Sequence, residues 1–137
     1  MTIRNLLADD HKIVISGLRS LIEREEDMQV IGMAEDGGAA VRLTKELAPD
    51  VVIMDIGMPV LNGIEATRQI SAEHPEVKII GLSMHSDRQT VMEMLNAGAL
   101  SYLLKECAFE DLVRAVRSVA QNRIYLPPSL VKMMTKD

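Results

Sequence analysis

Five short apolar segments recur along the chain, and each is followed by a stretch in which apolar residues have helical spacing. The five segments are residues 3–8, 28–34, 51–54, 77–82 and 100–104. Their lengths and their mostly polar boundaries predict β-strands. Because residues 51–54 are apolar at every position, that strand is expected to be covered on both faces, as in a parallel sheet.

The stretches between the strands predict five helices. The most regular of them has an apolar face formed by Phe109, Leu112, Val113, Val116, Val119 and Ala120. Glycine-containing turns mark helix ends at residues 36–38, 62–63 and 96–98. Strands and helices that alternate in this way predict a single α/β domain, with a doubly wound, parallel five-stranded sheet and helices on both of its faces.

Composition excludes several classes of protein. The net charge is −5, whereas a domain that binds nucleic acid directly is expected to carry a basic patch. No apolar run reaches the roughly 18 residues that span a bilayer, so we expect no membrane partner. The single cysteine, Cys107, cannot form an internal disulfide, which favours a cytoplasmic location.

The pattern changes near the end of the chain. From Tyr125 onward the sequence continues as Leu126-Pro127-Pro128-Ser129, which is typical of a domain edge. We therefore predict a domain over residues 1–124 and the start of a linker over residues 125–137.

Ionisable or hydroxyl-bearing residues follow four of the five predicted strands. Asp9 and Asp10 follow the first strand, Asp55 the third, Ser83 the fourth and Lys105 the fifth. Ligands of open α/β sheets bind beyond the carboxyl ends of the strands, so these side chains are expected to converge. Converging carboxylates repel one another unless a cation joins them, and Mg²⁺ prefers such oxygen ligands. Taken alone, Asp9 and Asp10 are equally compatible with a helix cap.

The order of these motifs resembles the receiver domain of two-component response regulators over about residues 3–122. The matching motifs are Ala8-Asp9-Asp10-His11, Met54-Asp55-Ile56-Gly57-Met58-Pro59, Asn62-Gly63, Gly81-Leu82-Ser83, Gly98-Ala99 and Tyr102-Leu103-Leu104-Lys105. Residues 10–14 and 124–130 are also similar to the NarL/FixJ (LuxR-type) subfamily of transcriptional regulators. The resemblance implies a flavodoxin-like fold with the strand order 2-1-3-4-5.

The resemblance implies that Mg²⁺ is bound at these strand ends. The implied ligands are Asp10, Asp55 and the backbone carbonyl of Gly57, with Asp9 acting through water. Asp55 is also the implied phosphoacceptor, whose carboxylate attacks phosphorus to give an acyl phosphate. A carboxylate is a weak nucleophile unless nearby cations neutralise the incoming phosphoryl oxygens, so physical chemistry agrees with these roles.

Three further residues have implied roles in responding to the phosphoryl group. Lys105 would pair with its oxygens, Ser83 would hydrogen-bond to one of them, and Tyr102 would turn inward as an aromatic switch. Tyr102 is equally compatible with a structural role as a half-buried strand tyrosine. Phosphorylation adds a charge of about −1.5 to −2, which is enough to bias a two-state loop.

The resemblance implies a phosphorylation-dependent switch, not an enzyme with turnover. A sensor histidine kinase would be the phosphoryl donor, and the domain would catalyse only its own phosphorylation and dephosphorylation. Phosphorylation would promote a homodimer. It would control transcription through a C-terminal DNA-binding domain that is absent from this chain.

Two positions depart from the usual family pattern. Gly57 stands where many members have a longer polar side chain, and we expect Gly57, Met84 and His85 to set the lifetime of the acyl phosphate through water access. Glu106 stands where many relatives have proline. A cis peptide bond between Lys105 and Glu106 would cost about 3–4 kcal/mol without proline.

Three alternatives remain open. An aspartyl phosphatase usually has a second acid two residues after its nucleophile, where this chain has Gly57. A flavodoxin-like cofactor binder needs a loop rich in glycine and hydroxyl groups after the first strand. Here the segment Ala8-Asp9-Asp10-His11, with its two acids, would repel a phosphate. A pseudo-receiver that only binds partners would not need all of the strand-end residues. His11 is interpreted as a residue that packs against or caps the first helix.

Overall fold

A computed structural model describes residues 2–84 and 87–134. Its sheet has five parallel strands in the order β2-β1-β3-β4-β5. The strands are β1 (Ile3–Ala8), β2 (Met28–Ala34), β3 (Val51–Asp55), β4 (Lys78–Ser83) and β5 (Ser101–Leu104). The helices are α1 (Lys12–Glu23), α2 (Gly37–Leu47), α3 (Gly63–Glu73), α4 (Arg88–Ala97), α5 (Ala108–Ala120) and α6 (Pro128–Met134). The predicted fold and strand order are confirmed, and each predicted strand agrees with the structure to within one residue at either end.

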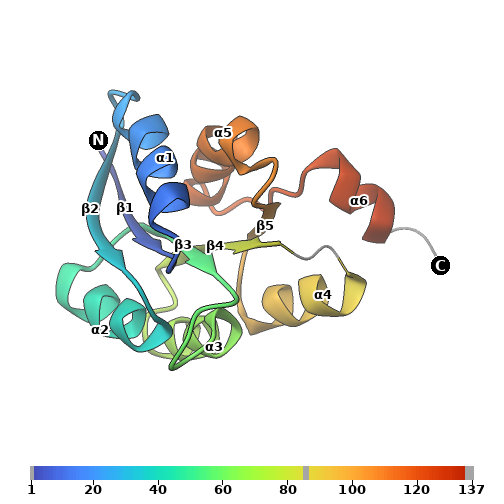
Figure 1. Cartoon of the computed structure of the whole chain (residues 1–137), viewed down its shortest axis with the longest axis horizontal. Coiled ribbons are helices and arrows are strands. Elements are labelled where there is room, and N and C mark those ends of the chain that lie inside the picture. The colour runs from blue at the N-terminus through green and yellow to red at the C-terminus, as the bar shows by residue number, and fades with distance from the viewer. Residues whose placement is uncertain (1, 85–86, 135–137) are drawn as a thin grey trace.

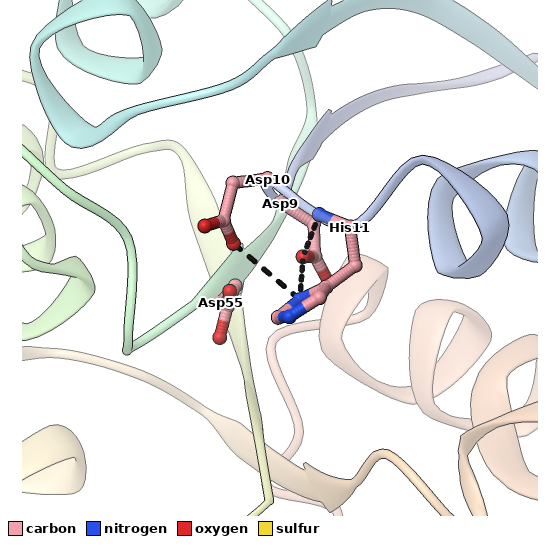
Figure 2. Close-up of side chains that lie close together, drawn as sticks. All are labelled: Asp9, Asp10, His11 and Asp55. Atoms are coloured by element: carbon pink, nitrogen blue, oxygen red, sulfur yellow. Dashed lines mark hydrogen bonds and ion pairs between the residues drawn. The ribbon is translucent and has the colours of Figure 1, made fainter.

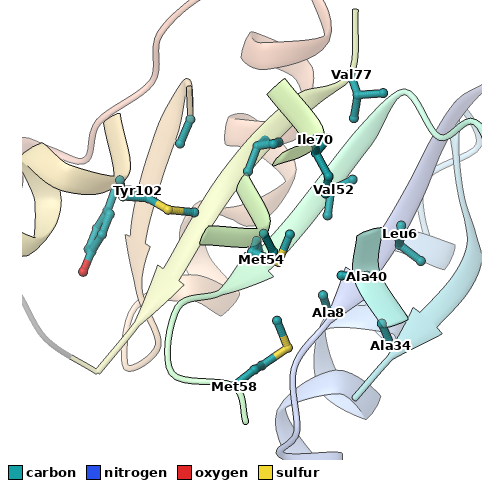
Figure 3. Packing of buried hydrophobic residues seen from close by; sticks show 14 of the residues in the cluster. Leu6, Ala8, Ala34, Ala40, Val52, Met54, Met58, Ile70, Val77 and Tyr102 are labelled. Atoms are coloured by element: carbon teal, nitrogen blue, oxygen red, sulfur yellow. The ribbon is translucent and has the colours of Figure 1, made fainter. Parts of the chain in front are cut away.

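Helices cover both faces of the sheet (Figure 1). α1 and α5 lie on one face, and α2, α3 and α4 lie on the other. Because successive strand residues point to opposite faces, Leu6 and Leu7 belong to different apolar clusters. Leu7 packs with residues of α1 and α5. Leu6, Val52 and Tyr102 belong to the cluster on the α2–α4 face, part of which Figure 3 shows. Residues 51–54 are buried, as their uninterrupted apolar sequence predicted, and so is Asp55, the last residue of β3.

The connection between β3 and α3 sets the position of Asp55, the last residue of β3. Asn62 caps α3, because its Oδ1 accepts a hydrogen bond from the Glu65 backbone N–H at 3.0 Å. The next residue, Gly63, lies so close to β3 that a Cβ would approach the Asp55 carbonyl oxygen to 2.2 Å. Only glycine fits this close approach. The Gly63 N–H also donates to the Ile56 carbonyl at 3.0 Å, which anchors the end of the strand.

Residues 125–134, where the sequence predicted the start of a linker, join the fold through Tyr125 and Leu130. The Tyr125 N–H donates to the Leu100 carbonyl at 2.9 Å, and Tyr125 forms an isolated bridge with the first residue of β5. α6 begins at Pro128, a favourable first helical residue because no helical partner exists there for an N–H. Leu130 is buried in the cluster on the α2–α4 face. The structure therefore adds a sixth helix to the five predicted, while the domain boundary itself stays a prediction.

The helices are short. The longest in the described part of the chain, α5, has 13 residues, whereas a helix that spans a bilayer needs about 20 apolar residues. Within residues 2–84 and 87–134, no helix is both long enough and apolar enough to cross a membrane.

Candidate functional site

Three predicted site residues meet at the carboxyl end of the sheet. Asp9 follows β1, Asp55 ends β3, and Lys105 follows β5. All three side chains are buried, with at most 5% of any of them exposed. The Lys105 Nζ lies 3.1 Å from Asp9 Oδ2 and 3.3 Å from Asp55 Oδ2. The topology thus joins residues of three strands in one ion-pair network, as their strand-end positions predicted.

Lys105 brings one positive charge between two buried carboxylates. Its Nζ also donates to Asp9 Oδ1 at 3.2 Å. Its backbone N–H donates to the Ser83 carbonyl at 2.8 Å, which continues the pairing of β4 and β5 beyond the last strand residue. The peptide bond from Lys105 to Glu106 is trans. Because one ammonium group cannot neutralise two carboxylates, the network keeps a net negative charge.

The two carboxylate oxygens of Asp55 have different environments. Oδ1 accepts a hydrogen bond from the Gly57 backbone N–H at 3.1 Å. Oδ2 faces Lys105 at ion-pair distance but receives no hydrogen bond from any described residue. Burial raises the pKa of the Asp55 carboxyl to about 6; the Gly57 hydrogen bond lowers it, the charge of Asp9 raises it and Lys105 lowers it. At neutral pH Asp55 is therefore ionised, and among the described residues the Oδ2 atom has Lys105 as its one charged partner.

Asp10 and His11 complete what we call the acidic pocket: Asp9, Asp10, His11, Asp55 and Lys105. Figure 2 shows the side chains of Asp10 and His11 extending from the loop after β1 toward Asp55. The His11 Nδ1 lies 3.0 Å from Asp9 Oδ1, 3.4 Å from Asp10 Oδ1 and 2.8 Å from the Lys105 Nζ. His11 occupies the N-cap position of α1, but its side chain makes no capping hydrogen bond with the described residues.

His11 was interpreted as a residue that packs against or caps the first helix, and the structure corrects the second of these, a side-chain cap. Sequence reasoning missed its place in the pocket because a polar residue directly before a helix is a common capping signal. One sequence signal could have located it. His11 continues the loop that begins with Asp9 and Asp10, so it lies at the same strand end as both acids.

The pocket can hold a divalent cation. Asp9, Asp10, His11 and Asp55 each offer a ligand atom, and these four atoms lie within 4.8 Å of one another. Divalent ions bind oxygen or nitrogen at about 2.0–2.6 Å, so ligand atoms on opposite sides of one ion are roughly 4–5 Å apart. The buried Oδ2 atoms of Asp9 and Asp55 receive no hydrogen bond from the described residues. A cation would satisfy both atoms, so the donor set fits the expected metal in charge and spacing.

A small cavity of about 80 Å³ adjoins the acidic pocket. Its lining residues are His11, Asp55, Ile56, Gly57, Ser83, Met84 and Lys105. Because one water molecule occupies about 30 Å³, the cavity leaves room for a small polar group beside Asp55. His85, which we also expected to affect water access, lies outside the described residues.

Ser83 connects this cavity to the apolar cluster on the α2–α4 face. Tyr102 on β5 belongs to that cluster and is fully buried, not half-buried as the structural alternative expected. Burial is compatible with a structural role and with a switch role. Burial raises the pKa of Tyr102, and a side-chain hydrogen bond with Ser83 opposes that shift. The two predicted switch residues are thus in contact, with the tyrosine ring inward. A movement of the ring stays a prediction.

Known proteins share this fold and this sequence pattern. Residues 6–117 match the family model for the response regulator receiver domain. The chain is 38% identical over 135 residues to the transcriptional regulatory protein DegU of Brevibacillus brevis, covering 98% of this chain and 57% of DegU. It is similar to the crystal structure of a LuxR-family two-component response regulator from Aurantimonas sp. SI85-9A1, with a TM-score of 0.92 and 36% identity over 98% of this chain and 96% of that one. A structure of two RcsB dimers bound to two parallel DNAs matches with a TM-score of 0.91 and 28% identity, covering 99% of this chain and 68% of that one.

The chain spans 57% of the length of DegU, so it corresponds to one part of that longer regulator. The family match covers most of this chain, and the sheet order agrees with it. The DegU and LuxR-family similarities extend over nearly the whole chain. The chain therefore belongs to the response-regulator receiver family of two-component signalling, in its NarL/FixJ (LuxR-type) subfamily.

Proposed function

We propose that this receiver is a switch that accepts a phosphoryl group on Asp55. The observation that carries the proposal is the environment of the Asp55 Oδ2. This buried oxygen lies 3.3 Å from the Lys105 Nζ and receives no hydrogen bond from the described residues. Asp55 also lines a cavity with room for a small polar group. A nucleophile thus stands beside a fixed positive charge, which is the arrangement that phosphoryl transfer requires.

In the proposed reaction, an Asp55 carboxylate oxygen forms a bond to phosphorus while the bond between phosphorus and the donor breaks. The donor leaves with that electron pair, and Asp55 neither gains nor loses a proton. Lys105 pairs with the phosphoryl oxygens, and the Ser83 hydroxyl donates a hydrogen bond to one of them. Both residues line the cavity beside Asp55, which supports these roles.

Mg²⁺ is the proposed metal, and when bound it supplies further neutralisation of the phosphoryl charge. The proposed ligands are Asp10, Asp55 and the Gly57 carbonyl, with Asp9 acting through water. The short spacing of the carboxylate oxygens and the unsatisfied Oδ2 atoms support this assignment.

Gly57 is proposed to limit the lifetime of the acyl phosphate by leaving it open to water. A Cβ added at Gly57 would meet only Asp55 Oδ1 among the described residues, at 3.8 Å, so a larger residue fits there. The expected result for Gly57→Asn is a changed dephosphorylation rate, measured as loss of phosphoprotein after the phosphoryl donor is removed. An unchanged rate would remove this role.

Ser83 and Tyr102 are proposed to transmit the phosphorylated state. Their side-chain hydrogen bond and the burial of Tyr102 support a coupled pair. A shift of Ser83 toward the phosphoryl group changes that bond, and with it the balance between positions of the Tyr102 ring.

We also propose for this chain the partners and the output that are typical of longer regulators. We propose a sensor histidine kinase as the donor, a cytoplasmic location, and a homodimer that forms on phosphorylation. We further propose that the receiver extends over residues 1–124 and that residues 125–137 lead toward a DNA-binding domain that controls transcription. The transcriptional regulator DegU and the DNA-bound RcsB dimers support this output.

The test is to incubate the protein with acetyl phosphate and Mg²⁺ and to measure intact mass. We expect the wild type to gain one phosphoryl group and Asp55→Asn to gain none. Asp50→Asn is the matched control, because Asp50 is an exposed aspartate next to the other end of β3, and it should be labelled like the wild type. Labelling of Asp55→Asn to the same extent as the wild type would refute the proposal.

The competing enzyme class predicts a different result. An aspartyl phosphatase would hydrolyse a small phosphoester through many turnovers, and its leaving group would be protonated by a second acid. Gly57 occupies that position and has no acidic group. We therefore expect no steady-state hydrolysis of a small phosphoester, as measured by release of inorganic phosphate.

A further inference from the structure

We propose that the His11 imidazole is an additional metal ligand, which gives the acidic pocket a preference for first-row transition cations over Mg²⁺. This inference uses the metal site of the proposed function but concerns a residue outside the proposed Mg²⁺ ligands. The class of cation it predicts is divalent and of intermediate softness, such as Co²⁺ or Ni²⁺.

The position of the ring nitrogen carries the proposal. His11 Nδ1 lies 3.0 Å from an Asp9 oxygen and 3.4 Å from an Asp10 oxygen. The distance to Asp10, one of the proposed direct ligands, resembles the roughly 3 Å that separates neighbouring ligand atoms around an ion held at about 2.1 Å. Figure 2 shows the ring beside the acids that would share the ion.

The surroundings of Nδ1 leave its lone pair facing the pocket. The Lys105 Nζ at 2.8 Å requires an acceptor, whereas Asp9 Oδ1 already accepts from the His11 backbone N–H and from Lys105. Nδ1 therefore presents a lone pair instead of an N–H. A metal cation can take lone pairs from the ring nitrogen and from the carboxylates together, while Lys105 keeps its ion pairs with Asp9 and Asp55.

The buried acids add a second, independent observation. Asp9 and Asp55 are almost inaccessible to solvent, and the Oδ2 atom of each lacks a hydrogen bond from the described residues. Both Oδ2 atoms share the Lys105 ammonium, at 3.1 and 3.3 Å, and one positive charge cannot neutralise two carboxylates. Burying the uncompensated charge costs free energy. Their orientation into the pocket therefore marks a cation site, independently of His11.

Ligand chemistry then predicts the preference. Mg²⁺ is a hard cation that takes oxygen ligands and retains water, so an imidazole adds little to its affinity. Affinities of nitrogen-containing sites rise from Mn²⁺ through Co²⁺ to Ni²⁺. An imidazole ligand therefore favours these ions selectively.

The test compares Co²⁺ and Mg²⁺ affinities by calorimetry at about pH 8. We expect His11→Ala to lower the preference for Co²⁺ over Mg²⁺ by roughly tenfold to a hundredfold. The backbone N–H of His11, which donates to Asp9 Oδ1 at 2.8 Å, survives this substitution and keeps Asp9 in place. Circular dichroism checks that the variant is folded.

Two controls make the result specific. His74→Ala should behave like the wild type, because His74 follows α3, where its nearest acid is Glu76 at 3.9 Å. Pulsed electron paramagnetic resonance with bound Mn²⁺ should show coupling to a ring nitrogen in the wild type and no such coupling in His11→Ala. An intense cobalt–thiolate absorption band would show binding at the exposed Cys107 instead, and would count against the proposal.

The outcomes separate this inference from the proposed function. An unchanged preference in His11→Ala, or nitrogen coupling that persists, overturns the role of His11 while wild-type labelling of Asp55 still stands. The converse pair of results refutes the proposed switch and leaves the metal ligand in place. In that case the wild type takes up no phosphoryl group with Mg²⁺, while His11→Ala still shows a lower preference for Co²⁺ than the wild type.

Discussion

Burial has opposite effects on stability in the acidic pocket and in a second region, which we call the α6 contact. In the α6 contact, four residues join the cluster on the α2–α4 face: Leu126, Leu130, Met133 and Met134. In the acidic pocket, burial removes charges from water, and one ammonium group only partly compensates for the carboxylates. In the α6 contact, burial removes apolar side chains from water and is favourable throughout. Ser83 and Tyr102 lie between the two regions. The pocket therefore stores unfavourable free energy that binding can release, whereas the α6 contact holds the chain in one arrangement.

The largest expected effect is in the pocket. Lys105→Met keeps the length of the side chain but leaves the buried Asp9 and Asp55 without their cation. Removing one partner of a buried ion pair is strongly destabilising, so we expect the free energy of unfolding to fall by about 3 kcal/mol. Urea denaturation in chelator, followed by circular dichroism, measures the change.

A comparison variant shows whether burial is the cause. The Lys78 Nζ contacts only Asn122 Oδ1 at the molecular surface among the described residues, at 3.0 Å. Lys78→Met should therefore change stability by less than about 1 kcal/mol. If both variants lost the same free energy of unfolding, burial of the pocket charges would not be the cause of the loss in Lys105→Met.

The α6 contact gives the next largest effect. Leu130→Ala removes a side chain that is 1% exposed, and we expect a loss of about 2 kcal/mol. Deleting residues 125–137 should cost at least as much, because it removes the whole contact. Urea midpoints measure both, with Val131→Ala, which changes a residue that is 45% exposed, as the control. A deletion variant as stable as the full chain would show that the α6 contact does not stabilise the receiver.

The pH dependence of the pocket comes third. The pKa of Asp55 is about 6 in the folded protein and 3.8 as its ordinary value. Between these pH values the folded chain holds a proton that the unfolded chain has released, so stability falls as pH rises through this window. We expect Asp55→Asn to raise the free energy of unfolding by about 1–3 kcal/mol at pH 7.5 without metal.

That gain should shrink toward pH 4, where Asp55 itself is protonated. Asp50→Asn serves as the control, because Asp50 lies exposed next to the other end of β3. Urea titrations at both pH values give the comparison. A gain that is the same at pH 4 and pH 7.5 would contradict the raised pKa.

The smallest expected effect is at the connection between the two regions. Ser83→Ala and Tyr102→Phe each remove one partner of a side-chain hydrogen bond. A double-mutant cycle should give a coupling of about 0.5–1.5 kcal/mol, the usual contribution of one such bond. If the two effects simply add, the residues do not communicate, and the proposed transmission through Tyr102 fails.

Much of the site was predictable because its residues follow strands. Alternating apolar segments and helical periods set the strand positions, and a parallel sheet brings the carboxyl ends of its strands together. Asp9, Asp55 and Lys105 therefore meet as expected. The direct contact of Lys105 with His11 was not predicted, because neither strand pattern nor spacing gives the orientation of a side chain in a loop.

The C-terminal residues show the opposite case. Local composition favoured a linker there, since two prolines follow Leu126 and interrupt the regular pattern. In the structure α6 packs against the cluster on the α2–α4 face, in which Leu130 is buried. Such a contact depends on the shape of a surface assembled from distant segments, and a local pattern does not encode it.

The sequence by itself thus determined the α/β fold, the strand ends and the set of acids, since each depends on local periodicity and chain order. Only the tertiary structure decided the orientation of His11, the single cation shared by two buried carboxylates, and the place of α6. These features depend on which side chains face one another after the strands align, and on whether buried charges find partners. Local periodicity therefore predicted which residues lie at the pocket, whereas their charge interactions depend on contacts between distant segments.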